Sequence, residues 1–572
     1  MRIVVRSVSL SVFVTLGSNL VAQGPSPATA TAPDPLPMKH AAAPTLPAIA
    51  PADLMSWLYA YADDSMMGRE AGSPWNLKAT AWIADQARQM GLVPAGENGT
   101  YFQDVPLVQV VYDSTGTLGT AAATFTAWTD FIPRDQARPT RSLDGVPVVY
   151  AGVWGDSAIP PEPAAGKLVL IGVRSGTNPS GQPAWQVNRI QASNRYRGAA
   201  GIAIASMDHM SPDFRAGLRE PRITMRGAAQ SDTAVVPSYL YVTAAMAQAL
   251  LGRSLAGAAP GTAGGTVRGR VAFVDVPAPA RNVVALLPGS DAKLKGTYVA
   301  IGAHNDHVGF GHFPVDHDSL RAFNTAVRRL VDSLPPGRSV SPQLFAGIRV
   351  NVDSLRRLRP ARPDSIFNGA DDDASGTVTV LEIAEQFAAE RQRPARSLLF
   401  IWHSAEELGL YGAQWFTDHP TVPRDSIVAQ LNIDMVGRGE AADLKGGGPG
   451  YLQLIGSRRL STELGDLVES VNKTQRQPFT FDYQYDAAGH PEQFYCRSDH
   501  YEYARYGIPI VFFSTGDHQD YHQVTDEPQY IAYAHLTRVA QLIHDVAKSV
   551  ANLDHRVAVD KPKPDPNAPC RQ

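Results

Sequence analysis

The sequence predicts an α/β fold: a mixed, largely parallel sheet sandwiched by helices, with a small β-rich module inserted in the chain. The first observation is a series of uninterrupted apolar segments of strand length at residues 282–287, 298–302, 397–402, 428–433 and 508–513. The second is their alternation with helical patterns at residues 376–391, 461–472 and 531–552. Strands that are apolar throughout are typical of a sheet that helices cover on both faces.

The third observation is a change of texture from about residue 146, where short apolar segments are separated by glycine and proline. Buried strands are predicted at residues 146–150, 167–171 and 201–205, a helix at 185–196, and a further strand and helix within 235–251. No His, Asp or Glu residues converge in this block. We therefore expect an inserted module that takes no part in the chemistry.

Length and composition set the broad class. A chain of 572 residues is too long for one core, and 44% hydrophobic with 19% charged residues is ordinary for a globular protein. A net charge of -4 gives no reason to expect nucleic acid or acidic membranes as partners. With only Cys496 and Cys570, a disulfide framework and a thiolate zinc site are both excluded, so a metal would need His and carboxylate ligands.

The N-terminus has the pattern of a secretory signal peptide at residues 1–22. Arg2 and Arg6 precede a mostly apolar segment that ends in small residues, and Ala22 precedes the expected cleavage point. Polar and small residues at 17–19 interrupt this segment, whereas a membrane anchor needs about 20 consecutive apolar residues. We expect export to the periplasm or the extracellular space, with no transmembrane segment, and a flexible Ala/Pro-rich linker at 23–50.

Two further regions flank the main pattern. Folded sequence is expected from about residue 52, with a helix at 75–90 and strand character at 101–112. The segment 308–367 is unusually long and contains amphipathic helical patterns at 320–334 and 352–358. A long segment beside a site is a candidate lid or specificity wall, and a solvated helical decoration is the alternative.

The stretch at residues 369–376, Gly-Ala-Asp-Asp-Asp-Ala-Ser-Gly, is the centre of the predicted site. Three consecutive acids beside an apolar helix are costly to bury, because clustered carboxylates repel one another and lose hydration. Bound metal ions would remove that cost. A calcium loop is the alternative, but the spaced oxygen ligands of that motif are missing.

Four more segments could complete a metal site. They are His304-Asn305-Asp306, Glu406-Glu407, Asp434, and His522 four residues before Asp526. Several of them follow predicted strands, and ligands of α/β sheets bind beyond the carboxyl ends of strands. Each segment is weak evidence alone, and their combination carries the prediction.

Residue chemistry divides these segments into roles. Two ions need a shared ligand, and the two oxygens of Asp372 suit that role. His304 and Asp434 can complete one ligand set, and Glu407 and His522 the other. Asp306 is placed to accept the remaining N–H of His304 and fix its tautomer.

Adjacent glutamates point in different directions, so one of Glu406 and Glu407 can ligate while the other faces the activated water as a base. Hydrolysis of an amide is the reaction that this set favours. His518 competes with His522 on residue type alone, and the spacing to Asp526 favours His522.

With these motifs the chain resembles the M28 (aminopeptidase Y-like) family of zinc metallopeptidases. The resemblance rests on the motifs at residues 302–307, 369–376, 404–409, 432–438, 498–500 and 521–526, and on Gly68-Arg69, Gly72 and Gly91-Leu92 near the start. The block at 146–251 resembles a protease-associated (PA) domain inserted in the peptidase domain.

The resemblance implies a zinc-exopeptidase (phosphorylase/hydrolase-like) fold and a domain plan. The plan is an N-terminal part of the peptidase domain at 51–135, a PA-like domain at 136–270, the catalytic domain at 271–555 and a polar tail at 556–572. It also implies an exported aminopeptidase that releases N-terminal residues from peptide substrates by attack of metal-activated water.

The roles follow residue by residue. Two Zn²⁺ ions are implied, bridged by Asp372, with Glu406 as general base and Tyr495 as donor to the reacting carbonyl; the metal ligands are His304, Asp372, Glu407, Asp434 and His522. Manganese or cobalt could occupy the same ligands. Oligomeric state and side-chain preference are not predicted.

The sequence departs from the family pattern in two places. The segment 308–367 exceeds the usual short loop, and Cys496 lacks the nearby cysteine with which some secreted members form a disulfide, so a bond to Cys570 stays open. His312 and His317 are expected to be ordinary surface residues. Alternative activities on this fold are glutaminyl cyclisation with one zinc and release of acidic residues from dipeptides as a carboxypeptidase. An inactive binding module is the non-enzyme alternative.

Overall fold

The computed structural model describes residues 36–134, 142–156, 158–176, 183, 185–227, 237–334, 342–345 and 347–572. The predicted signal peptide lies outside these residues. The chain divides into two compact units, one formed by Leu107–Ala278 and the other by the chain before residue 107 together with Pro279–Gln572. Each unit has its own sheet and core, so they are described in turn.

The larger unit is built on one nine-stranded sheet in the order β1-β15-β19-β16-β20-β23-β21-β22, with β2 also paired to β15. The strands are β1 Val93–Pro94, β2 Phe102–Asp104, β15 Arg281–Leu287, β16 Tyr298–His304, β19 Ser397–His403, β20 Ile427–Ile433, β21 Tyr451–Ile455, β22 Thr480–Asp482 and β23 Ile510–Ser514. Strands β19, β16, β20 and β23 are parallel to one another, whereas β15 is antiparallel to β19 and β21 is antiparallel to β23 but parallel to β22. This arrangement confirms the predicted mixed, largely parallel sheet.

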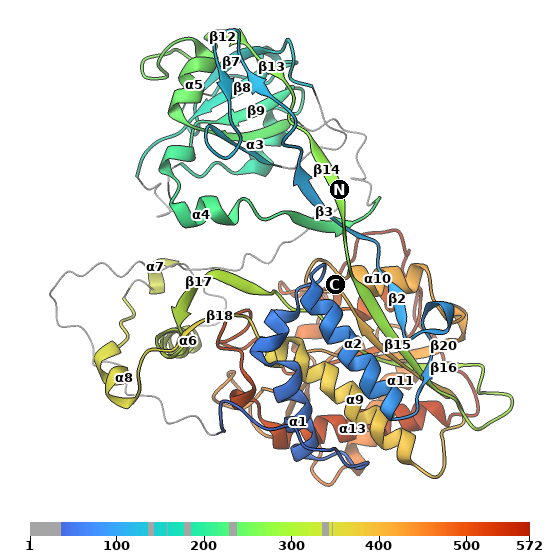
Figure 1. Cartoon of the computed structure of the whole chain (residues 1–572). Coiled ribbons are helices and arrows are strands. Elements are labelled where there is room, and N and C mark those ends of the chain that lie inside the picture. Colours follow the sequence, from blue (N-terminus) through green and yellow to red (C-terminus); the bar gives the residue numbers. More distant parts are fainter. Residues whose placement is uncertain are drawn as a thin grey trace. The chain divides into compact units, whose positions relative to one another are not determined.

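Helices cover both faces of this sheet, and Figure 1 shows several of them packed side by side. On one face lie α1 Pro51–Tyr61, α2 Pro74–Gln89, α9 Gly376–Ala389, α11 Thr462–Thr474 and α13 Tyr533–Ala551; on the other lie α10 Tyr411–Asp418 and α12 His500–Ala504. Alternation along β16 separates the two cores. Val299 and Ile301 belong to the same core as Leu381 of α9, and Ala300 belongs to the core on the other face, which contains Tyr503 of α12.

The smaller unit has a six-stranded sheet in the order β12-β7-β8-β9-β11-β6, packed between two apolar cores. Its strands are β6 Phe131–Arg134, β7 Pro147–Val153, β8 Leu168–Gly172, β9 Gly201–Ile204, β11 Ser238–Val242 and β12 Ala263–Thr266, and its helices are α3 Arg189–Arg195, α4 Pro212–Gly217 and α5 Ala244–Leu251. Two small sheets complete it, formed by β3 Leu107–Tyr112, β10 Arg222–Met225 and β14 Phe273–Ala278, and by β4 Leu118–Gly119, β5 Thr124–Phe125 and β13 Arg268–Gly269. Its identity as a PA domain stays a prediction.

The long segment before the acidic stretch is folded. It begins with β17 Phe310–Asp316 and ends with β18 Pro363–Ile366, which pair with each other, and between them lie α6 His317–Asp332, α7 Pro342–Phe345 and α8 Val352–Leu358. Helix α6 begins three residues before its predicted start because Asp316 caps it, accepting the N–H of Ser319 at 3.2 Å. His312 is exposed, as expected. The prediction that His317 is a surface residue is wrong, since only 3% of it is exposed.

Both ends of the described chain belong to the larger unit and are held there by specific contacts. Residues 36–50, part of the predicted linker, contact α9, where Thr45 donates to Glu385 and the N–H of Ala50 donates to Glu382. Near the other end a disulfide joins Cys496 and Cys570, the pairing that the sequence left open.

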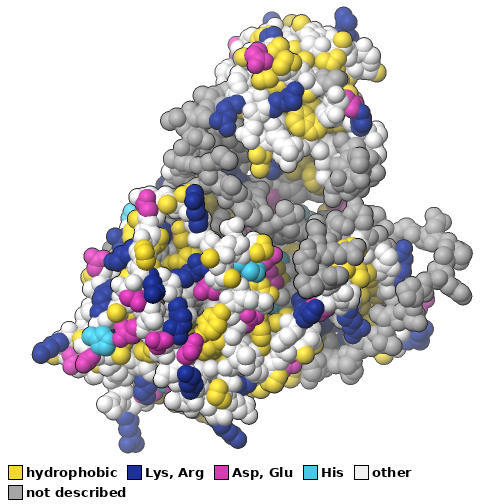
Figure 2. All heavy atoms as spheres, turned by 180° about the vertical axis from the view of Figure 1, so that it is seen from behind, with side chains coloured by type: hydrophobic (Ala, Val, Ile, Leu, Met, Phe, Trp, Pro, Cys, Tyr) yellow, Lys and Arg dark blue, Asp and Glu magenta, His cyan; other side chains and the backbone are white. Residues whose placement is uncertain are grey.

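The charge distribution on the surface and the apolar character of the helices bear on which partners the protein could bind. Figure 2 shows basic and acidic side chains interspersed on the displayed face of the larger unit, in keeping with the net charge of -4. Within the described ranges, no helix has the length and apolar character needed to cross a membrane.

Candidate metal centre

Three of the predicted site segments lie at one edge of the large sheet. Strand β16 ends at His304 between its parallel neighbours β19 and β20. Glu406 and Glu407 follow the end of β19, and Asp434 directly follows β20. Parallel strands bring their carboxyl ends to one edge, so these side chains meet there.

Asp372 and His522 reach the same edge from loops, and the two oxygens of Asp372 face different partners. Its Oδ1 lies 3.1 Å from Nε2 of His304, which is also 3.6 Å from Oδ1 of Asp434. Its Oδ2 lies 3.0 Å from Nε2 of His522, which is also 3.0 Å from Oε2 of Glu407. The predicted ligands therefore form two groups that share Asp372.

The spacing fits metal coordination. Ligand atoms about 2.0–2.2 Å from a tetrahedral zinc ion stand roughly 3.3–3.6 Å apart, close to the separations found here. The charges fit as well, because burial alone would lower the pKa of His522, yet the carboxylates of Glu407 and Asp372 raise it to about 11. The cluster is thus short of positive charge, which bound cations would supply.

His304 is oriented by a backbone carbonyl. Its Nδ1 lies 3.1 Å from the main-chain oxygen of Asp306, and a proton donated there leaves Nε2 unprotonated on the side of Asp372 and Asp434. The carboxylate of Asp306 is farther away, with Oδ1 at 3.7 Å from Nδ1, and it accepts the N–H of Glu406 at 3.1 Å. Asp306 thus links the His304 segment to the Glu406 segment.

Asp434 is oriented by Ser498, which the sequence analysis named only as part of the motif at residues 498–500. Ser498 donates its hydroxyl proton to Asp434 Oδ2 at 2.7 Å and accepts an N–H of Asn432 at 2.9 Å. The other oxygen of Asp434 is left to face His304. Ser498 therefore fixes the carboxylate of the first group.

The acidic loop that carries Asp372 is held by backbone hydrogen bonds. Asp373 accepts the N–H groups of His304, Gly376 and Met435, and Asp371 accepts that of Gly437 at 2.6 Å. Asp526 in turn accepts the N–H groups of Asp371 and Asp372 at 3.0–3.2 Å. These bonds leave Asp372 free to face the two groups.

A buried cation supports the start of this loop. Arg69 is fully buried and donates to the carbonyls of Asn368 and Gly369 at 2.7 and 3.0 Å. Gly369 has a φ of 53°, and a Cβ there would meet the carbonyl oxygen of Asp372 at 2.2 Å. Position 369 therefore needs glycine. The contacts of Arg69 give the arginine of the early Gly68-Arg69 motif a structural role in this loop.

Glu406 has the electrostatic setting of a base. Desolvation raises the pKa of its carboxyl well above the usual range. The charge of His304 lowers this pKa, and the carboxylates of Asp434 and Glu407 raise it further. In contrast, histidines hold the pKa of Asp372 well below its usual range despite burial, chiefly through hydrogen bonds from His304 and His522. One carboxyl is thus suited to hold a proton and the other to stay ionised.

The structure adds a histidine that sequence reasoning missed. His307 is buried, and its Nδ1 lies 2.7 Å from Glu407 Oε1 and 3.7 Å from Asp372 Oδ2. It belongs to the second group, with its ring 5.3 Å from that of His522. The available signal was its place three residues after His304 in the same motif.

The competing histidine lies elsewhere in the loop. Nε2 of His518 is 3.3 Å from Asp371 Oδ2 and 4.0 Å from Asp526 Oδ1. The structure therefore brings His522, and not His518, beside Asp372 and Glu407.

Two tyrosines differ in their relation to the centre. Tyr495 is buried among apolar residues under the guanidinium of Arg459, and burial raises its pKa to about 12, with further effects from Arg459, Tyr501 and Asp486 only. Tyr521, which the sequence left without a role, stacks on His522 at 4.0 Å, and its pKa is raised by burial and then by Asp372 and Glu407. Of these two tyrosines, Tyr521 is the one whose pKa is raised by carboxylates of the centre.

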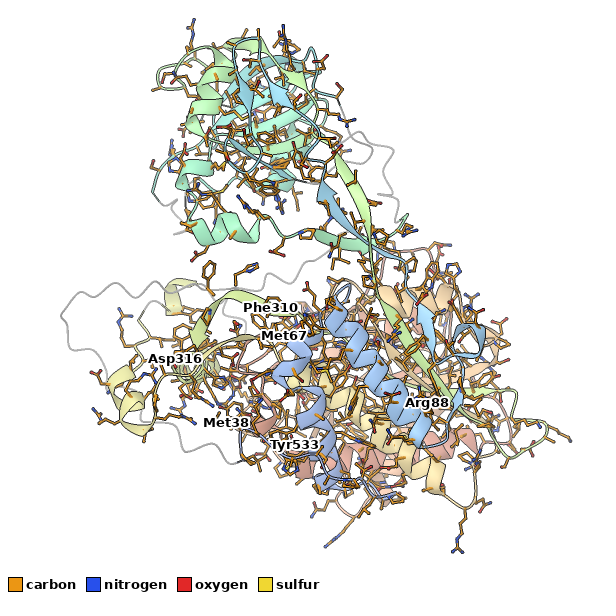
Figure 3. The ribbon with its side chains drawn as sticks, in the orientation of Figure 1. Met38, Met67, Arg88, Phe310, Asp316 and Tyr533 are labelled. Carbon is orange, nitrogen blue, oxygen red and sulfur yellow. A yellow bond between two sulfur atoms is a disulfide. The ribbon has the colours of Figure 1, made fainter. Side chains whose placement is uncertain are left out.

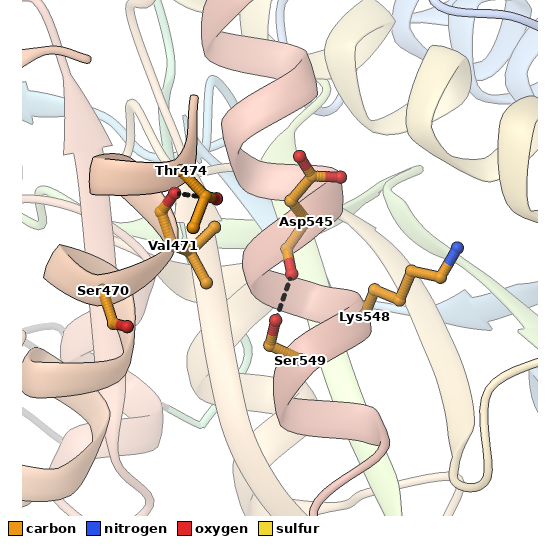
Figure 4. Close-up of a pocket in the computed structure, with 6 residues that line it drawn as sticks. All are labelled: Ser470, Val471, Thr474, Asp545, Lys548 and Ser549. Atoms are coloured by element: carbon orange, nitrogen blue, oxygen red, sulfur yellow. Dashed lines mark hydrogen bonds between the residues drawn. The ribbon is translucent and has the colours of Figure 1, made fainter. Parts of the chain in front are cut away.

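A hollow elsewhere on the larger unit contains none of the predicted site residues. It lies between α11 and α13 and is lined by Ser470, Val471, Thr474, Asp545, Lys548 and Ser549 (Figure 4). The hydroxyls of Thr474 and Ser549 donate to carbonyls of their own helices, at 2.7 and 2.8 Å. We assign no role to it.

Comparison with known proteins identifies the larger unit. The family model of peptidase family M28 matches residues 282–547, which contain both ligand groups. The matched region of this chain belongs to peptidase family M28. The predicted recognition is confirmed, whereas the PA identity of the smaller unit is not tested.

Individual relatives match this chain over limited stretches. Leucine aminopeptidase 1 of Coccidioides posadasii is 46% identical over 74 residues, 12% of this chain and 19% of that protein. A probable leucine aminopeptidase of Arthroderma benhamiae is 37% identical over 130 residues, 22% of this chain and 33% of that protein. The chain thus spans a third or less of the length of these relatives.

Among solved structures, an aminopeptidase from Aneurinibacillus sp. strain AM-1 covers 90% of this chain and 97% of its own, with 17% identity and a TM-score of 0.45.

Proposed function

We propose that this M28 peptidase is a binuclear zinc aminopeptidase that hydrolyses the N-terminal peptide bond of peptides. The observation that carries the proposal is the position of Asp372, whose two oxygens each face a separate group of nitrogen and oxygen ligands. One zinc would be held by His304, Asp372 and Asp434, and the other by Asp372, Glu407 and His522. Zinc in this centre would supply Lewis-acid polarisation of the carbonyl and acidification of water.

The residues of the chain would manage the proton. Glu406, with its raised pKa, would accept a proton from the attacking water and return it to the leaving amine. Its backbone is tied to Asp306, which keeps the glutamate beside the centre. Tyr521 stacks on His522 with 4.0 Å between the ring centroids, so we propose it, beside Tyr495, as a candidate donor to the carbonyl oxygen.

The aminopeptidase mode rests on similarity. The relatives named above carry the description leucine aminopeptidase, and their matches show local identities of 46% and 37%. The cyclase alternative needs only one zinc, and the complete second group speaks against it. Export remains part of the proposal: the predicted signal peptide is supported by the Cys496–Cys570 disulfide, since disulfides persist in oxidising compartments.

The first test measures metal content and substrate preference together. We expect two zinc ions per chain and cleavage of peptides with a free amino terminus, but not of N-blocked peptides, with loss of turnover in a chelator. One zinc per chain with cyclisation of N-terminal glutamine would instead establish the cyclase activity. Cleavage from the carboxyl end would establish a carboxypeptidase.

The second test replaces the proposed base. Glu406→Gln should lower kcat by about 10²–10⁴-fold, because proton transfer is lost, while two zinc ions remain bound. Glu440→Gln, at an exposed glutamate, is the matched control and should keep full activity. Retained turnover in Glu406→Gln would exclude this residue as the base.

A further inference from the structure

The long segment between His304 and Asp372 is attached firmly at the start of α6. Asp316, labelled in Figure 3, caps the helix through Ser319, accepts the N–H of Arg362 at 3.0 Å, and forms an ion pair with Arg356 of α8. The cap thus ties α6 to both α8 and the approach to β18. Its first turns therefore have a fixed position within the larger unit.

One face of α6 contacts the loop that carries His522. His317, Arg321 and Asn324 are spaced by four and three residues, which places them on the same side of the helix. Nε2 of His317 lies 3.2 Å from the hydroxyl of Tyr530, and Nδ2 of Asn324 donates to Thr525 Oγ1 at 3.4 Å. The segment 308–367 is therefore joined to the loop and is more than a solvated decoration.

Arg321 is the central contact of this face. Its Nη1 donates to Asp520 Oδ2 at 2.5 Å, and its guanidinium lies over the ring of Tyr530 at 3.3 Å from the centroid. Its side chain is 20% exposed, whereas that of Asp520 is fully buried. The arginine thus reaches from the insert into the interior of the loop.

Asp520 connects this contact to the core. The same oxygen accepts an N–H of the buried Arg438 at 3.1 Å, and its other oxygen accepts the hydroxyl of Thr525 at 2.8 Å. Asp520 is therefore held from two sides, by Arg438 of the core and by Arg321 of the insert. Losing one arginine would leave the carboxylate with an incomplete set of partners.

The loop between these contacts carries the second ligand group. His522 lies two residues after Asp520, in a turn where the N–H of Gln523 donates to the carbonyl of Asp520 at 2.9 Å. Its φ is 55°, a conformation that surrounding contacts must maintain for a residue other than glycine. A shift of Asp520 would therefore alter the turn that sets the position of His522.

We infer that the insert serves as a brace for the second metal, with Arg321 of α6 as a positioning residue that holds His522 through Asp520. The inference rests on the proposed binuclear function and deepens it. In the first group His304 and Asp434 lie at strand ends, so Arg321 bears more directly on the second metal than on the first. The brace thus couples the long insert to metal occupancy.

The test compares variants of two arginines on the same helix. Arg321→Ala removes the brace, Arg321→Lys keeps the charge but not the planar guanidinium, and Arg328→Ala is the matched control, since Arg328 pairs with Asp332 within α6. Zinc affinities are measured on the full chain by competition with a chelator. We expect Arg321→Ala to bind one zinc normally and the other about 10–100-fold more weakly, with partial recovery in Arg321→Lys and no change in Arg328→Ala.

A second readout needs no metal. Backbone amides at 517–527 should exchange hydrogen faster in metal-free Arg321→Ala than in the parent protein or in Arg328→Ala. Unchanged exchange, or two unchanged zinc affinities, would overturn the inference, as would an equal loss of both ions. If the parent protein binds fewer than two zinc ions, the proposed function fails, and the exchange experiment still decides whether Arg321 holds the loop.

Discussion

The two sides of Asp372 are built differently. On the first side His304 is the last residue of β16 and Asp434 directly follows β20, so the sheet itself sets the positions of both residues. On the second side His522 belongs to an irregular loop whose support comes from side chains of other elements, such as Arg321 and Arg438. Asp372 is thus shared by a group placed at strand ends and a group in a loop that is held by side chains.

The difference has a chemical consequence. Sites placed at strand ends are ordered by the backbone ladder, whereas a loop must be ordered by contacts that each cost conformational entropy. The second side contains one more side chain that could bind a metal, because His307 lies with Asp372, Glu407 and His522. We therefore expect the second metal to depend more strongly on distant residues than the first.

The largest effect should follow removal of the ligand common to both sides. Asp372→Ala should abolish tight binding of both zinc ions and lower kcat/KM by on the order of 10³-fold or more, because several kcal/mol of metal stabilisation is lost. Metal content and kinetics check this, with Asp466→Ala, at an exposed aspartate of α11, as the control. One zinc still bound tightly would show that the two sides do not depend on a common bridge.

A smaller and one-sided effect is expected at Ser498. Ser498→Ala removes the hydroxyl that orients Asp434 and should weaken the first zinc about 10–100-fold while leaving the second unchanged, the reverse of the Arg321 pattern. Chelator competition measures both affinities. Ser514→Ala is the control, because Ser514 is equally buried, 2% exposed, and its hydrogen bonds within the described residues go to backbone groups. Equal weakening of both ions would contradict the independence of the two sides.

The same difference explains what the sequence could predict. Apolar strand segments made the sheet predictable, and the position of a residue just after a strand is a local property, so His304, Glu406 and Asp434 could be expected at one edge. His522 was separated from His518 only by spacing. The distances place His522 beside Glu407, but the metal roles of all these residues stay predictions.

What escaped prediction depended on contacts between distant segments. The burial of His317 follows from its packing against Tyr530, more than 200 residues away. The helical periodicity of residues 320–334 could not predict that contact. Tyr521 differs in this respect, because it directly precedes His522 in the sequence and only the stacking of the two rings required the structure. Tertiary contacts also paired Cys496 with Cys570, 74 residues apart.

The smallest effect is expected at a buried carboxyl outside both sides. Burial raises the pKa of Glu382 in α9 to about 8, so its contribution to stability is complete below pH 4.5 and is lost as pH rises through 8. Glu382→Gln should therefore leave the free energy of unfolding of the metal-free protein nearly unchanged at pH 5 and raise it by about 1–3 kcal/mol at pH 9. Denaturant unfolding at both pH values measures this, with pH 5 as the control. A change in either zinc affinity would show that the metal centre extends to α9, because Glu382 contacts the N–H of Ala50 and neither ligand group.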